Sequence, residues 1–393
     1  MNETLQIKNF GPLIDIDLQL ERTTVFIGTQ GSGKSCISKL LSIFRSSDNF
    51  TSKIDLENLL TKYNINSFLK KETVIRYSTN HCEITVKNKR ITFKQLNTEE
   101  VNKFSEKNAL VQALFEEYRN VKDKLENDAT PSGLLTTLTK EIIDEYGLLH
   151  ILKNSLTKDP IYIPSERIFI STISESLFGL SNNKIALPQC IIDFGTLFEN
   201  HRKTTPNLNI DFLNIKYANK NNSDKIILDK KTEIKLSESS SGIQALVPML
   251  VILDGTCKFS NNSTFVIEEP EINLYPLNQK KLIQFIIDKC ISKKDNDLII
   301  TTHSPYVLNS LNLGILAHRV GSIESKKNAV INVIPEIYWI NPSEITAYYL
   351  DDGKCKNIYD KNTGYIAITD LDDVSNLIDA DKDKLNAINR GEI

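Results

Sequence analysis

The 393-residue sequence has no apolar run near the roughly 18–20 residues that span a bilayer, and no basic stretch followed by an apolar segment at its N-terminus. Its six cysteines are scattered and form no C-x-x-C pair, which disfavours a disulfide framework or a zinc site. A net charge of −3 is no large excess of either sign, so it neither predicts nor excludes nucleic acid as a partner. We therefore expect a cytoplasmic protein with reduced thiols, no membrane partner and one or two domains.

Short strand patterns are spread along most of the chain. Alternating apolar and polar residues over 14–20 predict a half-buried strand, and the apolar run 24–27 predicts a buried strand that leads through a glycine loop into a helix over 36–44. Further strands are predicted at 73–78, 82–87, 90–94, 161–164, 226–228, 265–267 and 298–300. An amphipathic helix over 277–290 separates the last two, and this strand–helix–strand spacing predicts parallel pairing.

Helical spacing replaces the strand patterns in one internal segment. Apolar residues recur every three or four positions over 110–125 and again over 135–149, with a turn-rich stretch between them. We interpret this segment as a helical hairpin inserted into a β-rich frame.

A phosphate-binding loop is predicted between the strand at 24–27 and the following helix. Residues 28–35, GTQGSGKS, match the pattern G-x-x-x-x-G-K-[ST] in the context that the pattern requires. Backbone N–H groups of such a loop point at phosphates, and the helix N-terminus adds partial positive charge. Lys34 would bridge the β- and γ-phosphates, and the Ser35 hydroxyl would bind Mg²⁺. A glycine-rich turn with a chance lysine is the disfavoured alternative.

Two glutamates follow the predicted strand at 265–267. Glu268 is the candidate ligand of Mg²⁺, and Glu269 is the candidate general base that polarises the attacking water. An E-E-P-E run alone is more often a solvated loop, but here it ends a buried strand downstream of a phosphate loop. His303 ends the next strand, at the edge where α/β folds place their chemistry, and it is a candidate sensor of the γ-phosphate.

A serine-rich segment, residues 239–244, precedes a helix predicted at 245–253. Small residues at a helix start are good caps, which is the simple explanation. They also present N–H groups and hydroxyls that can bind an anion.

The order of these motifs resembles the ABC-type ATPase superfamily, and within it the branch of the SMC proteins, RecF, the double-strand-break repair ATPases and the OLD-family ATPases. The resemblance rests on IKNFGP at 7–12, IEEPE at 267–271 with Leu274 and Pro276, and THSP at 302–305. The segment YIPSER at 162–167 is similar to an element of short bacterial ATPases of anti-phage defence systems such as Septu and PARIS.

The resemblance implies an α/β fold: a P-loop ABC-ATPase head with an N-terminal antiparallel β-lobe, a RecA-like parallel-sheet lobe and an inserted helical hairpin. The expected division is lobe I with the P-loop at 1–99, the hairpin at 100–158, lobe II with the signature, the Walker B strand and the switch histidine at 159–335, and a C-terminal α/β cap at 336–393.

The resemblance also implies the ligands of each site. ATP is expected to contact Gly28, Thr29, Gln30, Gly31, Ser32, Gly33, Lys34, Ser35 and Cys36. Mg²⁺ is expected on Ser35 and Glu268, although Glu268 stands where the family usually has Asp. The signature residues of a second copy would contact the γ-phosphate, which makes ATP the link in a head-to-tail dimer; these are Ser240, Ser241, Gly242 and Gln244.

Glu269 would then be the base and His303 the switch histidine. Gln95 is a candidate for the Q-loop, and Glu271 belongs to the loop that communicates across the dimer. Arg167 either lines the site or holds lobe II with an ion pair.

Two functions are compatible with such a dimer, besides a scaffold that binds ATP without hydrolysing it. In the first, it senses infection and controls a partner nuclease or toxin encoded nearby, because the chain shows no nuclease of its own; Asp370 and Asp372 lack the upstream part of a toprim site. In the second, it is a RecF- or SMC-like ATP-dependent DNA clamp in repair, which would depend steeply on salt.

Overall fold

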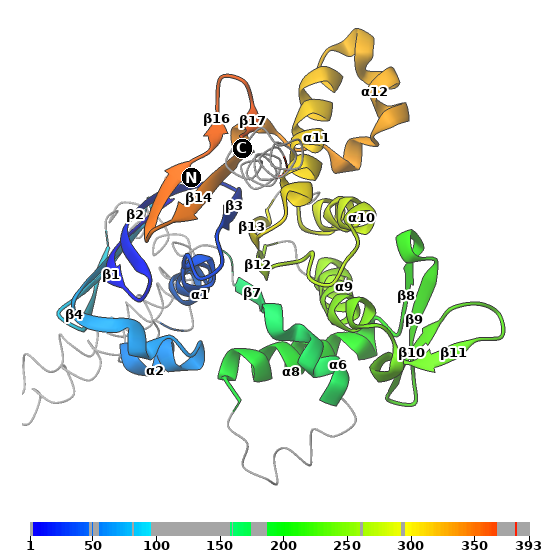
Figure 1. The fold of residues 1–393 in the computed structure, drawn as a ribbon, viewed down its shortest axis with the longest axis horizontal. Coiled ribbons are helices and arrows are strands. Elements are labelled where there is room, and N and C mark those ends of the chain that lie inside the picture. Colours follow the sequence, from blue (N-terminus) through cyan, green and yellow to red (C-terminus); the bar gives the residue numbers. More distant parts are fainter. Residues whose placement is uncertain are drawn as a thin grey trace, which may run out of the picture.

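The computed structural model describes residues 3–46, 55–80, 82–95, 160–173, 187–259, 262–291 and 295–367, and singly 49, 158 and 382. One eleven-stranded sheet, in the order β6-β5-β4-β1-β2-β15-β14-β3-β13-β12-β7, forms the frame (Figure 1). The hairpin predicted at 100–158 lies outside the described residues, Lys158 excepted. None of the described helices combines the length and hydropathy that a membrane span requires.

One half of the sheet is antiparallel. It consists of β1 (Glu3–Phe10), β2 (Leu13–Leu20), β4 (Leu69–Ser78), β5 (Cys82–Lys87) and β6 (Arg90–Gln95). Ile7 of β1 pairs with Ile16 of β2 and Ile75 of β4, so the apolar positions of neighbouring strands share one buried face. The strands predicted in this half are confirmed.

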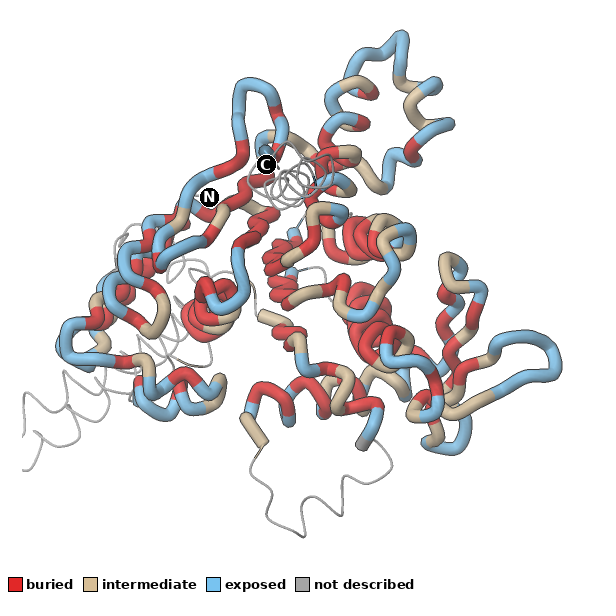
Figure 2. Tube along the Cα trace, in the orientation of Figure 1, coloured by how far each residue is buried: buried red, intermediate tan, exposed pale blue. Residues whose placement is uncertain are grey.

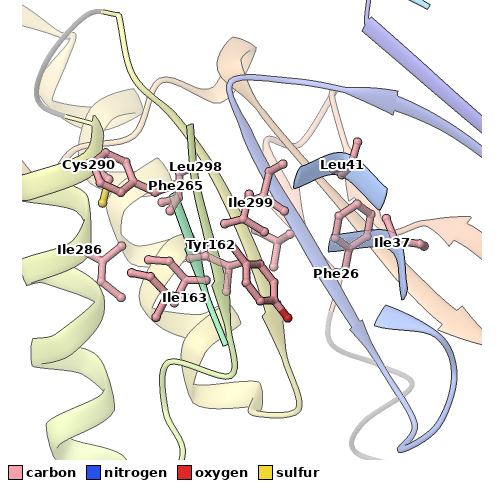
Figure 3. Close-up of a cluster of buried hydrophobic side chains, with 14 of the residues drawn as sticks. Phe26, Ile37, Leu41, Tyr162, Ile163, Phe265, Ile286, Cys290, Leu298 and Ile299 are labelled. Carbon is pink, nitrogen blue, oxygen red and sulfur yellow. The ribbon is translucent and has the colours of Figure 1, made fainter. Parts of the chain in front are cut away.

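The other half is parallel and almost entirely buried. The strands β3 (Thr23–Gly28), β13 (Asp297–Thr302), β12 (Thr264–Glu268) and β7 (Pro160–Ile163) pair in parallel, as near-continuous apolar runs do when both faces are covered. Helix α1 (Lys34–Arg45) covers one face, and α10 (Pro276–Ile286) with its π-turn (Ile287–Ile291) covers the other. Figure 3 shows these strands between Ile37 and Leu41 of α1 and Ile286 and Cys290 beyond them. The predicted fold class is confirmed.

The first two C-terminal strands belong to the main sheet and join its two halves, whereas residues 368–393 of the cap predicted for 336–393 lie outside the described residues, Lys382 excepted. Strand β14 (Ile345–Asp351) lies parallel to β3, and β15 (Lys354–Asn357) links it to β2. Ile345, Ala347 and Leu350 are buried in the core. The run ITAYYLD gave no strong alternation, because both of its faces are covered, and periodicity could not assign it to a central strand.

Smaller elements surround this frame. Helices α9 (Ser241–Phe259), α8 (Gln189–Thr204), α6 (Ile168–Ile173) and α11 (Pro305–Gly321) pack on lobe II, with α2 (Leu56–Lys62) beside lobe I and α12 (Lys327–Val333) beside α11. A small sheet follows α8 and contains β8 (Asn207–Ile210), β9 (Ile215–Lys220), β10 (Ser223–Ile227) and β11 (Glu233–Lys235). Short strands β16 (Tyr359–Asp360) and β17 (Tyr365–Ile366) form a ribbon. Figure 2 shows that burial concentrates in the central strands and in α9.

Candidate functional site

The phosphate loop connects the end of β3 to the start of α1. Gly31 and Gly33 have φ values of 79° and 99°, which residues with a side chain rarely adopt. A Cβ on Gly33 would lie 2.3 Å from Leu13 Cδ2, and one on Gly28 would lie 2.0 Å from the Leu350 carbonyl oxygen, whereas Gly31 borders open space. Glycine at 28 and 33 therefore lets the loop pack against β2 and β14. By helix geometry the N–H groups of Lys34 and Ser35 have no intrahelical acceptor and can bind an anion, whereas the Cys36 N–H donates to the Gly33 carbonyl (3.0 Å).

Lys34 fills the centre of this loop. Its Nζ donates to the carbonyl oxygens of Gly28 (2.9 Å) and Thr29 (2.8 Å) and contacts Ser32 Oγ at 3.4 Å. Burial lowers the pKa of Lys34 to about 8, against the opposing charges of Glu269, Glu271 and Glu268. The ammonium is therefore held mainly by neutral carbonyls, where a phosphate would offer it a charged acceptor.

Glu268 lies against α1 one turn beyond Ser35. It is 1 % exposed, and its Oε1 accepts a hydrogen bond from Ser38 Oγ. Burial raises the pKa of this carboxyl. Ser35 and Ser38 share one face of the helix, so Glu268 stands beside the predicted metal ligand.

The oxygens of Ser35 and Glu268 are the hard donors that Mg²⁺ prefers. Among the residues that the structure describes, no cluster of three His, Cys, Asp or Glu side chains could hold a metal alone. The residues therefore fit an ion that takes most of its ligands from phosphate and water, as Mg²⁺ in nucleotide sites does.

Glu269 and His303 meet at the ends of adjacent strands. Glu269 Oε1 lies 3.2 Å from His303 Nε2, and the two side chains are 29 % and 36 % exposed. The backbone of Glu269 has φ 42°, a strained value for a residue with a side chain, and its N–H donates to the Thr301 carbonyl (2.9 Å). The structure thus brings together the predicted base and the predicted sensor, within reach of solvent.

Glu271 is buried and bonded to the turn that carries His303. Its Oε1 accepts hydrogen bonds from Thr302 Oγ1 (2.6 Å) and from the His303 N–H (2.9 Å), whereas its Oε2 is buried without a partner among the described residues. Burial raises the pKa of Glu271. Thr302 lies in the THSP motif but was not predicted as a site residue, because the motif does not say which of its side chains contacts the acidic loop.

Arg167 fits neither of the two predicted alternatives. Its side chain is fully buried, and its three nitrogens donate to main-chain carbonyls of Pro164, Ala245, Glu268, Glu269 and Pro270. Burial lowers its pKa to about 10, which leaves the guanidinium protonated at neutral pH. Arg167 therefore fixes the backbone on which Glu268 and Glu269 stand, by hydrogen bonds to carbonyls and not by an ion pair.

The serine-rich segment leads into α9, which begins at Ser241, earlier than the predicted residue 245. Ser240 and Ser241 are exposed at this helix start. Gly242 is buried, and a Cβ there would lie 2.6 Å from the Asn273 carbonyl oxygen. The Gln244 side-chain amide donates to the carbonyls of Ser237 (3.0 Å) and Ser239 (2.7 Å), so it braces its own loop and is not turned to a ligand. In Figure 1, β7 and β12 lie between α9 and α1.

Gln95 is not placed beside the other site residues. It ends β6, the outermost strand of the antiparallel half, and pairs there with Cys82. Its assignment to the Q-loop stays a prediction.

Comparison with known proteins gives one family and several structures of low similarity. The family model described as "AAA domain, putative AbiEii toxin, Type IV TA system" matches residues 23–309. No curated protein matches the chain.

Among solved structures, the SMC head domain from Thermotoga maritima is similar at 11 % identity and a TM-score of 0.39, over 91 % of this chain and 98 % of that chain. An Smc head domain bound to the C-terminal domain of ScpA, derived from Pyrococcus furiosus, is similar at 12 % identity and a TM-score of 0.37, over 90 % and 95 %. The recombination mediator protein RecF is similar at 12 % identity and a TM-score of 0.32, over 91 % and 97 %.

The family model spans most of the chain, from the first residue of β3 into α11, and so includes the phosphate loop, the acidic strand end and His303. The chain therefore belongs to the family described as AAA domain, putative AbiEii toxin, Type IV TA system.

Proposed function

We propose that this protein binds ATP with Mg²⁺ and hydrolyses it at the carboxyl ends of β3, β12 and β13. The observation that carries the proposal is the contact of Glu269 with His303, beside a lysine whose ammonium lies within the field of three glutamates. Glu269 is the residue best placed to orient water, because its carboxylate is partly exposed, whereas Glu268 and Glu271 are buried.

Each group of residues has a separate task in this proposal. The loop N–H groups and Lys34 bind the phosphates, and Mg²⁺ on Ser35 and Glu268 neutralises their charge. Glu269 takes the proton of the attacking water. His303 donates to or contacts the γ-phosphate and keeps the Glu269 carboxylate directed at the water. Arg167 holds the main chain of Glu268 and Glu269, so that these side chains need little rearrangement.

A second copy of the chain is proposed to complete the site. Ser240 and Ser241 are exposed at the N-terminus of α9, which carries free N–H groups and partial positive charge. Because α9 lies across the strands from its own α1, these groups suit the γ-phosphate of ATP bound to another copy. Binding of ATP would then close a head-to-tail dimer, and hydrolysis would release it.

The proposed cellular role is regulation of a partner nuclease or toxin after infection is sensed, in a bacterial anti-phage defence system of the Septu or PARIS kind. The support is the description of the matched family, which names a toxin of a toxin–antitoxin system. The alternative is a DNA clamp of the RecF or SMC kind. One feature bears on it: Lys87 and Arg90 are exposed and lie opposite each other on β5 and β6, whereas Lys8, in the same row on β1, is paired with Asp15 (3.8 Å).

ATP hydrolysis by the Glu269→Gln variant tests the proposed reaction. The amide keeps the size of the side chain but cannot take a proton, so kcat should fall by about 10²–10⁴-fold. Binding of ATP should persist, and light scattering should detect a dimer that survives in ATP. Glu72→Gln, an exposed glutamate on β4, is the matched control. A Glu269→Gln variant that hydrolyses ATP at the parent rate would show that another group is the base.

The partner is tested by a pull-down of tagged Glu269→Gln protein, with ATP and Mg²⁺, from cells that carry the native locus. A stoichiometric nuclease or toxin encoded beside the gene supports the defence role. Recovery of DNA without a protein partner supports the clamp instead.

A further inference from the structure

The loop after β12 and the turn after β13 are joined by two side-chain bridges. In the first, Glu271 Oε1 accepts from Thr302 Oγ1 and the His303 N–H. In the second, Gln279 Nε2 donates to the Leu274 carbonyl (3.0 Å), and Gln279 Oε1 accepts from Ser304 Oγ (2.6 Å). The two segments directly follow the buried strands β12 and β13, and the bridges hold one segment against the other.

The first bridge holds the main chain of His303. Its ring contacts Glu269, and its main-chain N–H is held by Glu271, so two glutamates of one loop fix the residue at both ends. Ser304 begins α11 as its N-cap, and its N–H donates to Thr302 Oγ1 (3.0 Å). A shift of Glu271 would therefore move the Thr302–Ser304 turn and the His303 ring together.

The same loop reaches the signature turn of α9. Leu274 N–H donates to the Glu271 carbonyl (3.0 Å), which closes a tight turn around Asn273 at φ 59°. The Asn273 carbonyl in turn packs directly on Gly242, where no side chain would fit. Glu271 thus stands in a continuous series of contacts from the signature glycine to the His303 ring.

The unpartnered oxygen of Glu271 indicates that its place is not set by packing alone. A buried carboxylate oxygen without a donor is costly, and a threonine or alanine would avoid the cost. The two hydrogen bonds that its other oxygen accepts therefore account for the position of the carboxylate.

We propose that Glu271 is the positioning residue of the switch histidine: it holds the His303 main chain so that the ring meets Glu269. This inference rests on the proposed ATPase function and adds to it a residue that touches neither water nor phosphate. It assigns to Glu271 a role inside its own chain, whereas the family resemblance implied that its loop communicates between the two chains of a dimer.

The test compares Glu271→Ala with Glu271→Gln in the full-length chain. A glutamine carbonyl can accept both hydrogen bonds, whereas alanine accepts neither. Glu271→Ala should lower kcat by about 10²-fold, because a small displacement of reacting groups has effects of that size, with KM for ATP within about twofold of the parent. Glu271→Gln should recover most of kcat. Glu72→Ala is the control for loss of an exposed glutamate.

The ring of His303 gives a readout that does not require hydrolysis. In protein labelled with ¹⁵N-histidine, the His303 signals are assigned by their loss in His303→Gln, among the five histidines of the chain. Glu271→Ala should change the ¹⁵N chemical shifts of the His303 ring, because the ring moves relative to Glu269, and Glu271→Gln should restore them.

Parent-like His303 signals in Glu271→Ala overturn the inference, and so does a Glu271→Ala variant that keeps the parent kcat. A joint loss of thermal stability and ATP affinity, with His303 signals unchanged, also overturns it, since that is the mark of a structural residue. If the parent hydrolyses no ATP, the proposed function fails, but the His303 signals still decide whether Glu271 positions the ring.

Discussion

Helix α1 carries a buried cation at each end, and the two cations have opposite pKa shifts. Lys34, the first residue, is held by neutral carbonyls, and burial lowers its pKa to about 8. Burial also disfavours the charged form of Arg45, the last residue, but the charges of Glu3 and then Asp297 raise its pKa above the usual value. The macrodipole adds to the contrast, because it favours a cation only at the C-terminal end.

The charges around Arg45 are completely paired. Arg45 donates to both oxygens of Glu3 (2.8 and 2.6 Å), Tyr77 donates to one of them (2.8 Å), and Asp297 contacts Arg45 (3.5 Å) and Lys158 (2.8 Å). At the other end, Glu271 keeps an unpartnered oxygen and Glu269 a strained backbone. The difference shows that the charges around Arg45 are satisfied within the fold, whereas the site end keeps an unsatisfied carboxylate oxygen and a strained backbone.

Removing Arg45 should have the largest effect on stability. Arg45→Met leaves Glu3 and Asp297 buried without their main partner, which should cost about 3–5 kcal/mol of unfolding free energy in urea titrations. ATP affinity of the folded protein should stay at the parent value. Arg76→Met, which loses an exposed pair with Glu83 (3.9 Å), is the control and should cost less. Equal losses for both variants would remove the distinction between the two ends.

Removing Lys34 should have the converse effect. Lys34→Ala should weaken ATP binding by at least about a hundredfold, since bonds to charged groups contribute about 1.5–3 kcal/mol each. Its unfolding free energy should change by less than about 1 kcal/mol, because the substitution removes the cost of burying the charge together with the hydrogen bonds that the charge makes. Nucleotide fluorescence and urea titrations measure the two quantities, with Lys70→Ala as an exposed control. A loss of stability comparable to that of Arg45→Met would contradict this expectation.

The pH dependence of ATP binding sharpens the contrast further. Bound phosphate raises the pKa of Lys34 above its value of about 8 in the nucleotide-free protein. Above pH 8, binding of ATP is therefore coupled to uptake of a proton by Lys34. Affinity should therefore be level below pH 8 and fall by up to about tenfold per pH unit above it. Lys34→Arg, which stays protonated, should flatten the curve between pH 8 and 10. A parent curve that is equally flat would mean that Lys34 does not contact the phosphates.

The smallest effect is expected from Tyr77→Phe. It removes one of three hydrogen bonds to Glu3 and leaves the Arg45 pair intact. The loss should be about 1 kcal/mol in urea titrations, without a change in ATP affinity. A loss as large as that of Arg45→Met would mean that the hydroxyl, and not the guanidinium, holds Glu3.

The sequence predicted those parts of the site that lie in short contiguous segments. The loop around Lys34 and the strand-end residues Glu269 and His303 have local patterns, and parallel pairing of β12 with β13 brings the last two together. The bonds of Arg167 to five carbonyls, and of Glu271 to Thr302, join segments far apart in the chain, and no local pattern encodes them. The place of β14 was also missed, since a strand covered on both faces has no alternation to show.

The position of β3 has a consequence for synthesis of the chain on the ribosome. Both neighbours of this fully buried strand, β13 and β14, are made much later than β3 itself. Roughly 300 residues separate β3 from β14, and at a translation rate of about 5–20 residues per second their synthesis takes about 15–60 s. During that interval the nascent chain presents an apolar strand with two open edges, so chaperone demand should be greatest until the final strand leaves the exit tunnel.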